Sequence, residues 1–232
     1  MIAEAITKIL TLGEAQVLKI EDREYSNKQL YPIREDGPAP LLISTLTGIV
    51  DYLKKNVDKF SAEELLIHVA SPTEVTLMSI LLAPWGDRHR YVKVVPDFKV
   101  FPFGQYQEVE SFIIGLQSQF VQDEMTAEIL KLVGNLKDEN VMNIGDDGKS
   151  QQVTVRSGIS SVAVANVPNP VELAPFRTFR EIAQPSSRFV LRMKQGGMCA
   201  LFEADGGAWK NEAVIRIKKF LEEAVPDVSV IA

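Results

Sequence analysis

Two β-rich segments joined by a turn restrict the fold of this chain more than any other feature of its sequence. Residues 73–83 and 88–95 are rich in β-forming side chains, and Pro84-Trp85-Gly86-Asp87 between them has the composition of a turn. The second half of the first segment carries apolar residues at neighbouring positions, so both faces of this strand are apolar. The sequence therefore predicts a long β-hairpin over residues 73–95. The two apolar faces must be buried by helices of the same chain or, if the hairpin projects, by a neighbouring subunit.

Helices and further strands are expected on both sides of this hairpin. Apolar residues that recur at helical spacing predict helices, and short apolar runs bounded by turn residues predict strands. The opening helix carries Ile2, Ile6 and Ile9 on one stripe and ends at Gly13. The other expected helices are 46–57, 107–120, 126–136 and 209–224, and the other expected strands include 65–70, 188–194, 198–202 and 227–231.

The order of these elements predicts an α+β fold, in which mixed helices pack on an antiparallel sheet that includes the long β-hairpin. With 232 residues, of which 46% are hydrophobic, the chain can bury one substantial core. We therefore expect a single globular unit of residues 1–232. Two parts of it are candidates for separate features, namely a projecting hairpin over 73–95 and a sheet-and-helix subdomain over 137–232.

The sequence predicts no membrane partner. Its longest apolar runs, around Leu65, Ile80 and Leu82, span three to five residues, whereas a membrane-crossing helix needs ~20. The start of the sequence carries no basic segment before its apolar residues, so a secretory signal is not expected. Cys199 is the only cysteine, which fits a reducing compartment. These features predict a cytoplasmic protein.

Three aspartates are weak candidates for a metal site. Asp146, Asp147 and Asp205 offer oxygen ligands for a hard cation, or paired carboxylates for acid–base chemistry. Asp-Gly steps are also ordinary turn chemistry, and no histidine or further carboxylate stands at a motif spacing from them. We therefore expect these residues in turns, and we expect no catalytic residue, no metal and no cofactor.

The most basic stretch of the chain lies between residues 177 and 194. Clustered guanidinium groups beside phenylalanines suit phosphate contacts and base stacking. Arginine is also the usual residue of ion pairs within a fold or at an interface, and the chain has a net charge of −6. We favour pairing within the fold or with a neighbour over nucleic-acid binding. The basic residues are Arg177, Arg180, Arg188, Arg192 and Lys194, and the phenylalanines among them are Phe176, Phe179 and Phe189.

Four residues are candidates for contacts between subunits. Trp85 stands at the expected hairpin turn, and Arg88 and Arg90 follow it closely. Ile215 stands among the charged residues on the outer side of the last helix. Exposed apolar residues of this kind are typical of interaction surfaces. A homo-oligomer is therefore the expected state of the protein.

Four segments resemble signatures of the YfdQ-like family of phage and prophage proteins. They are FIIGLQSQF over residues 112–120, DDGKSQ over 146–151, RTFREI over 177–182 with Gln184-Pro185, and DGGAWK over 205–210. The resemblance spans most of the chain and implies a phage or prophage origin in a bacterial host. It supplies no catalytic residues that carry over to this sequence.

The order of elements also resembles the shell fold shared by tailed-phage capsids and encapsulins. In that resemblance the hairpin corresponds to the extended loop, and residues 107–136 correspond to the spine helix. It is a topological resemblance, and a fold by itself does not define a function.

Three functions are consistent with the sequence. The favoured one is a phage- or prophage-encoded, non-enzymatic protein that forms a homo-oligomeric, shell-like structural assembly. The second is a phage accessory factor in DNA metabolism or counter-defence that binds nucleic acid or nucleotide through residues 177–194. The third is a hydrolase that uses Asp146, Asp147 and Asp205 with a divalent metal. We favour the first because of the two-faced apolar hairpin and the absence of a convincing catalytic constellation.

Overall fold

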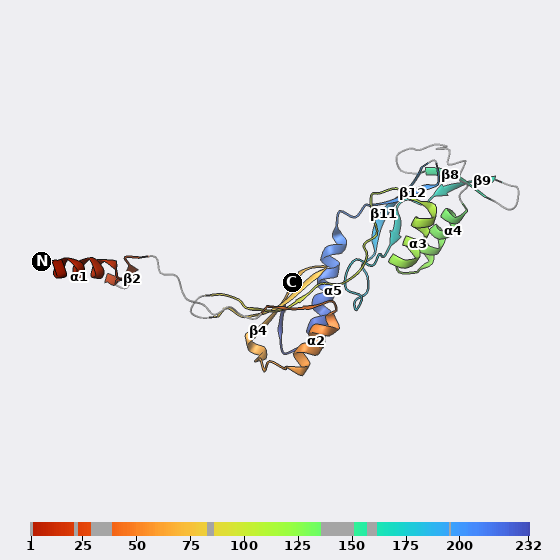
Figure 1. The fold of residues 1–232 in the computed structure, drawn as a ribbon. Helices are drawn as coiled ribbons and strands as arrows, with labels where there is room; N and C mark the ends of the chain where they lie inside the picture. Colours follow the sequence, from red (N-terminus) through yellow and green to blue (C-terminus); the bar gives the residue numbers. More distant parts are fainter. Residues whose placement is uncertain are drawn as a thin grey trace. The chain divides into compact units, whose positions relative to one another are not determined.

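The computed structural model divides the chain into two compact units, Met1–Pro38 and Ala39–Ala232 (Figure 1). This division differs from the single unit of residues 1–232 expected from the sequence. The structure describes residues 2–20, 23–28, 39–82, 86–135, 151–156, 162–194 and 196–232. Within these ranges it contains five α-helices together with antiparallel and mixed sheets, so the predicted α+β class is confirmed.

The N-terminal unit consists of one helix and one small hairpin. Helix α1 (Ile2–Gly13) follows the apolar stripe predicted from the sequence. Strands β1 (Val17–Ile20) and β2 (Arg23–Ser26) pair antiparallel, with Val17 opposite Ser26. Every side chain whose burial is described in this unit is exposed. The unit therefore has no core of its own among these residues.

A mixed five-stranded sheet forms one half of the second unit. Its strands follow the order β13-β4-β5-β6-β3. The three central strands pair antiparallel, and each edge strand pairs parallel to its neighbour. The strands are β3 (Leu41–Ile43), β4 (Leu65–Ser71), β5 (Glu74–Ser79), β6 (Arg90–Val94) and β13 (Ser229–Ile231).

Helices α2 (Leu46–Lys55) and α5 (Ala208–Ala224) pack on one face of this sheet (Figure 1). Helix α2 begins after Thr45, whose hydroxyl accepts a hydrogen bond from the Gly48 N–H at 3.1 Å. A short 3-10 turn, η1 (Ala62–Glu64), leads into β4. Alternate strand residues and helix residues at helical spacing meet in this first core, which includes Leu46, Ile49, Ile67, Leu77, Val92, Ile217 and Leu221.

The predicted hairpin is present but does not project along its regular part. Strands β5 and β6 pair antiparallel, and both lie inside the five-stranded sheet. They are shorter than predicted, because regular pairing of β5 ends at Ser79 and only an isolated bridge, Leu82 to Asp87, continues toward the turn. One face is covered by the chain's own helices, which is one of the two sources of cover expected. Residues 83–85, with Trp85, lie outside the described residues.

A four-stranded antiparallel sheet forms the other half of the second unit, in the order β10-β11-β12-β7. Helices α3 (Val109–Gln119) and α4 (Glu124–Gly134) pack on its inner face (Figure 1). Asp123 caps α4 by accepting a hydrogen bond from the Thr126 N–H at 2.8 Å. The strands are β7 (Gln107–Glu108), β10 (Val171–Leu173), β11 (Ser187–Lys194) and β12 (Met198–Glu203), and a separate hairpin joins β8 (Gln151–Arg156) to β9 (Val162–Val167).

Phenylalanine rings dominate this second core. The Phe101 ring contacts Phe112 and Phe120 edge to face, with centroids 5.8 Å and 5.0 Å apart. Gly115 of α3 lies directly against Phe101, since a Cβ added there would come within 2.7 Å of the ring. The small residue therefore lets the helix approach the aromatic cluster closely.

The expected subdomain over residues 137–232 does not match this arrangement. Strands β10, β11 and β12 share their core with α3 and α4, which precede residue 137. Helix α5 and strand β13 belong to the first core instead. The C-terminal part of the chain is thus divided between the two sheets, because each sheet packs against helices that are distant in sequence from some of its strands.

Candidate functional site

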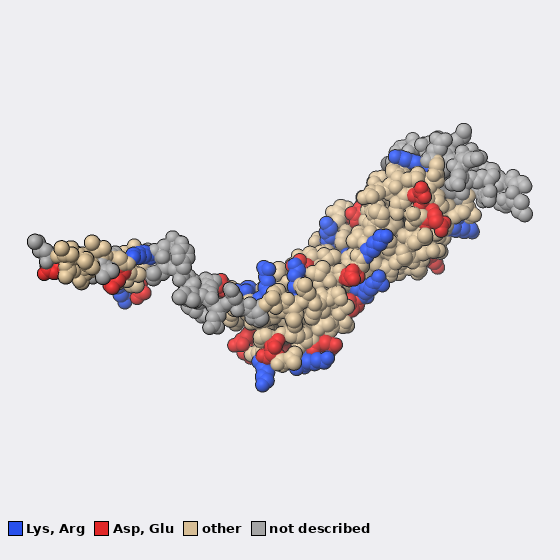
Figure 2. Space-filling model, in the orientation of Figure 1, with Lys and Arg blue, Asp and Glu red and all other residues tan. Residues whose placement is uncertain are grey.

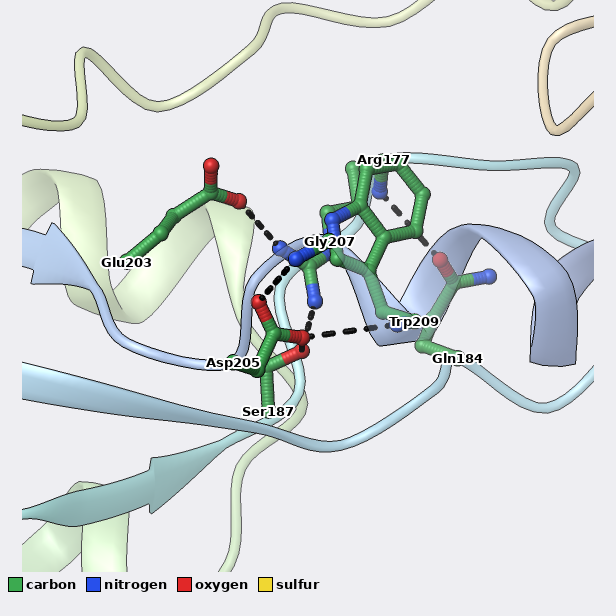
Figure 3. A network of polar contacts seen from close by, with 7 residues as sticks. All are labelled: Arg177, Gln184, Ser187, Glu203, Asp205, Gly207 and Trp209. Atoms are coloured by element: carbon green, nitrogen blue, oxygen red, sulfur yellow. Dashed lines mark hydrogen bonds and ion pairs between the residues drawn. The ribbon is translucent and has the colours of Figure 1, made fainter.

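A buried arginine, Arg177, organises a network of polar side-chain contacts (Figure 3). It stands in the loop between β10 and β11. Its partners come from the start of β11, the end of β12 and the first turn of α5. The network therefore joins the four-stranded sheet to the helix that packs in the first core.

The guanidinium of Arg177 is held by charge, hydrogen bonds and ring contacts together. Its Nη1 lies 2.7 Å from Glu203 Oε1, and its Nη2 donates to the hydroxyl of Ser187. The guanidinium carbon lies 3.9 Å from the ring centroid of Trp209 and 5.6 Å from that of Phe189. Only 4% of the Arg177 side chain is exposed. Burial lowers the pKa of Arg177 to about 10, so the group still carries its charge at neutral pH.

Asp205 extends this network to the start of α5. Its carboxylate accepts hydrogen bonds from the Ser187 hydroxyl at 2.7 Å and from the backbone N–H groups of Gly207 at 3.0 Å and Trp209 at 3.4 Å. Burial alone would raise the pKa of Asp205. The three hydrogen bonds and the charge of Arg177 outweigh it, so the pKa of Asp205 lies below its ordinary value.

Through these contacts the network holds the start of α5 against the four-stranded sheet. Asp205 accepts hydrogen bonds from the backbone at the start of α5, and Arg177 pairs with Glu203. For Arg177, this is pairing within the fold, one of the two forms of pairing that we favoured for the arginine stretch. Gly207 has a φ of +82°, so the turn before α5 uses a left-handed conformation that glycine adopts without strain. Asp146 and Asp147, the other two metal candidates, lie outside the described residues. In the part of the chain that is described, no three His, Cys, Asp or Glu side chains come close enough to hold a metal ion.

The basic stretch does not form a single cluster. Arg180 is exposed and lies over the ring of Phe176, 5.2 Å from its centroid. Arg188, Arg192 and Lys194 stand at alternate positions of β11, so they share the face of the sheet that α3 and α4 do not cover.

The phenylalanines near the arginines do not serve as stacking platforms. Phe179 is fully buried in the first core, and Phe189 is fully buried in the second. The loop and the strand pleat direct both rings inward, where Phe189 lies beside the buried Arg177. Only Phe176 keeps an arginine, Arg180, over its ring at the surface.

Two other aromatic rings, which the sequence pattern did not indicate, accompany the cations of β11. Lys194 Nζ lies 3.8 Å from the centroid of the Tyr106 ring. Tyr106 contacts Phe202 of β12 with centroids 6.0 Å apart and ring planes at 68°. Phe202 lies opposite Val190, which places it on the same face as Arg188 and Lys194. The alternation of side chains between the two faces of each strand could have indicated these rings, but only if the pairing of the strands had been known.

The candidates for subunit contacts are scattered. Arg88 donates through Nη1 to the Ser79 carbonyl at 3.0 Å, so its side chain lies along the end of β5. Arg90 is exposed at the start of β6, and Ile215 is 65% exposed on α5. Acidic and basic side chains alternate over the face seen in Figure 2, without a large patch of one sign.

A cavity of about 410 Å³ lies where α2 and α5 end. Its lining is mainly apolar, and the charged residues in it are Lys54 and Asp227. A pocket of this size lies within the usual range of ligand sites, but catalysis needs convergent polar or titratable groups. The remaining lining residues include Leu53, Phe60, Leu65, Val225 and Val228.

Comparison with known proteins identifies no relative, since no family model, curated protein or solved structure matches the chain. The resemblance to the YfdQ-like family therefore stays a prediction from the sequence. Within the described residues, no helix is both long and apolar enough to cross a membrane.

Proposed function

We propose that the chain is a phage- or prophage-encoded, non-enzymatic protein whose copies associate into a homo-oligomeric, shell-like structural assembly in the cytoplasm of a bacterial host. The observation that carries this proposal is the N-terminal unit, in which apolar side chains are exposed on a helix and a hairpin and the residues of described burial form no core. The phage origin and the shell-like form rest on the resemblances in the sequence.

The N-terminal unit needs a partner on physical grounds. A two-stranded hairpin is marginally stable in water, and so is a helix shorter than ~12–15 residues. Helix α1 has 12 residues, and the Ile2 side chain on it is 79% exposed. Ile2, Ile6 and Ile9 follow the i, i+4, i+7 spacing with which an amphipathic helix enters an apolar groove. A second copy of the chain is a suitable partner, because it is always present at the same concentration as the N-terminal unit that needs it.

The second unit offers apolar surface that fits this role. Leu42, on edge strand β3, is 79% exposed, and Leu81 and Ile215 are also largely exposed. Large exposed apolar side chains on more than one element favour association over a monomeric state. These residues are the surfaces that we assign to contacts between copies.

Light scattering after size-exclusion chromatography tests the proposal on the full chain. We expect a mass several times the 25.8 kDa of one chain at micromolar concentration. The double variant Ile6→Asp/Ile9→Asp should lower that mass, because it places two charges on the apolar stripe. Lys8→Glu changes the net charge by the same amount outside the apolar stripe and should leave the mass unchanged. A wild-type monomer would refute the proposal.

A further inference from the structure

The face of the four-stranded sheet that α3 and α4 do not cover combines three cations of β11 with aromatic rings. We call it the outer sheet face and define it by Tyr106, Arg188, Arg192, Lys194 and Phe202. Residues two positions apart on a strand lie about 6.6 Å apart on one face, so Arg192 and Lys194 are neighbours. The cations of β11 form a row that Val190 interrupts between Arg188 and Arg192. Arg188 and Lys194 are exposed at the two ends of the row, and Arg192 is half-buried between them.

The aromatic rings lie beside this row on neighbouring backbone. Tyr106 immediately precedes β7, and Phe202 belongs to β12, so the two rings bridge adjacent strands of the sheet. Both rings are half-buried, which holds them in place while part of each remains accessible. Lys194 lies over Tyr106 at 3.8 Å and so connects the row of cations to the rings.

We propose that the outer sheet face binds single-stranded nucleic acid. Cations in a row can follow the phosphates of one strand, and aromatic side chains on a sheet can stack unpaired bases. In a duplex the bases are already stacked on each other, so the rings would contribute little. An acidic peptide would use the cations but has no bases for Tyr106 and Phe202. This inference is independent of the proposed assembly, because it rests on a different surface.

The charges of this face predict weak and salt-sensitive binding. Glu172 lies opposite Arg188, and Glu108 lies opposite Met198 next to Lys194, so carboxylates partly offset the cations. Two phosphate contacts, through Arg188 and Lys194, correspond to a slope of about −1.4 for the logarithm of affinity against the logarithm of salt concentration. We therefore expect micromolar affinity at low salt and a loss of about sevenfold between 50 and 200 mM salt.

Fluorescence anisotropy with labelled oligo-dT and oligo-U of about 12 nucleotides tests the proposal on the full chain. Tyr106→Leu/Phe202→Leu should weaken binding at least tenfold. Arg188→Gln/Lys194→Gln should weaken binding and flatten the salt dependence. Lys218→Gln/Lys219→Gln is the matched control, because these lysines lie on α5 and pair with Glu222 and Glu223 four residues away. The control should bind like the wild type.

Several results would overturn the proposal. They are no binding at 50 mM KCl, equal losses in the α5 control, unchanged binding after removal of both rings, or equal affinity for a duplex of the same length. If the ring variant fails to fold, the exposed charge-reversal variant Arg188→Glu/Lys194→Glu decides the question, and unchanged binding by it overturns the proposal. Circular dichroism of each variant establishes whether it is folded.

Discussion

Replacing Arg177 by methionine should destabilise the second unit more than any exposed arginine replacement. Methionine keeps much of the volume and apolar stem of arginine but removes its charge and its donors. The change leaves Ser187 and Glu203 without their donor and removes the cation over the Trp209 ring. The first turn of α5 loses part of its attachment to the sheet as a consequence.

The magnitude follows from the burial of the two partners. Breaking a fully buried ion pair costs about 3–5 kcal/mol. Here Arg177 is 4% exposed but the Glu203 side chain is 42% exposed, so water can solvate the carboxylate once it is alone. Loss of the contact with the Trp209 ring adds about 1 kcal/mol. We therefore expect the free energy of unfolding to fall by about 2–4 kcal/mol.

Urea unfolding followed by far-ultraviolet circular dichroism measures this loss. The protein concentration is held fixed, because association makes the apparent stability depend on it. Arg188→Met is the matched control on β11 and should change stability by no more than about 0.5 kcal/mol. Arg177→Lys keeps the charge without the planar fork and should fall between the wild type and Arg177→Met. If Arg177→Met and Arg188→Met lose the same amount, the role assigned to the network is wrong.

Two further predictions concern single groups. The folded-state pKa of Asp205 lies below its ordinary value of 3.8, so the ionised carboxylate stabilises the fold fully above that value and loses this effect as the pH falls through the lower folded-state pKa. Asp205→Asn should therefore cost about 1 kcal/mol at pH 7 and progressively less below about pH 4, and a cost independent of pH in urea titrations would contradict this. Burial raises the pKa of Cys199 to about 12, so a thiol reagent at pH 8 should label the native protein at least about a hundredfold more slowly than the urea-unfolded chain. Native labelling at the unfolded rate would show that the thiol is accessible.

Local structure was largely predictable because it depends on short-range periodicity. Helix α5 begins within one residue of the position expected from its apolar spacing, and α2 begins at the expected Leu46. Helix α3 begins later than expected. Gln107 and Glu108 pair with β12 instead, and this depends on a strand about 90 residues further along the chain.

Strand partners were less predictable because pairing is decided at long range. Strands β3 and β13 join the five-stranded sheet at opposite edges and from opposite ends of the second unit's sequence. Each pairs parallel to its neighbour, and parallel neighbours are not joined by a tight turn, so the sequence carries no turn signal for these pairs. The β5–β6 hairpin does carry such a signal. The same pairing places β5 inside the sheet, so the hairpin does not stand apart along its regular part.

The candidate site was likewise predictable only in part. The basic stretch and its aromatic neighbours were visible in the sequence, but burial separated Arg177 from Arg188 and Lys194 and turned Phe179 and Phe189 inward. Tyr106 and Phe202 lie almost 100 residues apart in the chain, and only the register of the sheet brings their rings together.

The sequence by itself therefore determined the fold class, most helices and the presence of the basic stretch, since composition and periodicity act over a few turns or strand residues. Only the tertiary structure decided which arginine is buried, which face of β11 lies away from α3 and α4 and which rings accompany its cations. Burial and cross-strand contact depend on where distant segments pack, and no local pattern encodes that choice uniquely.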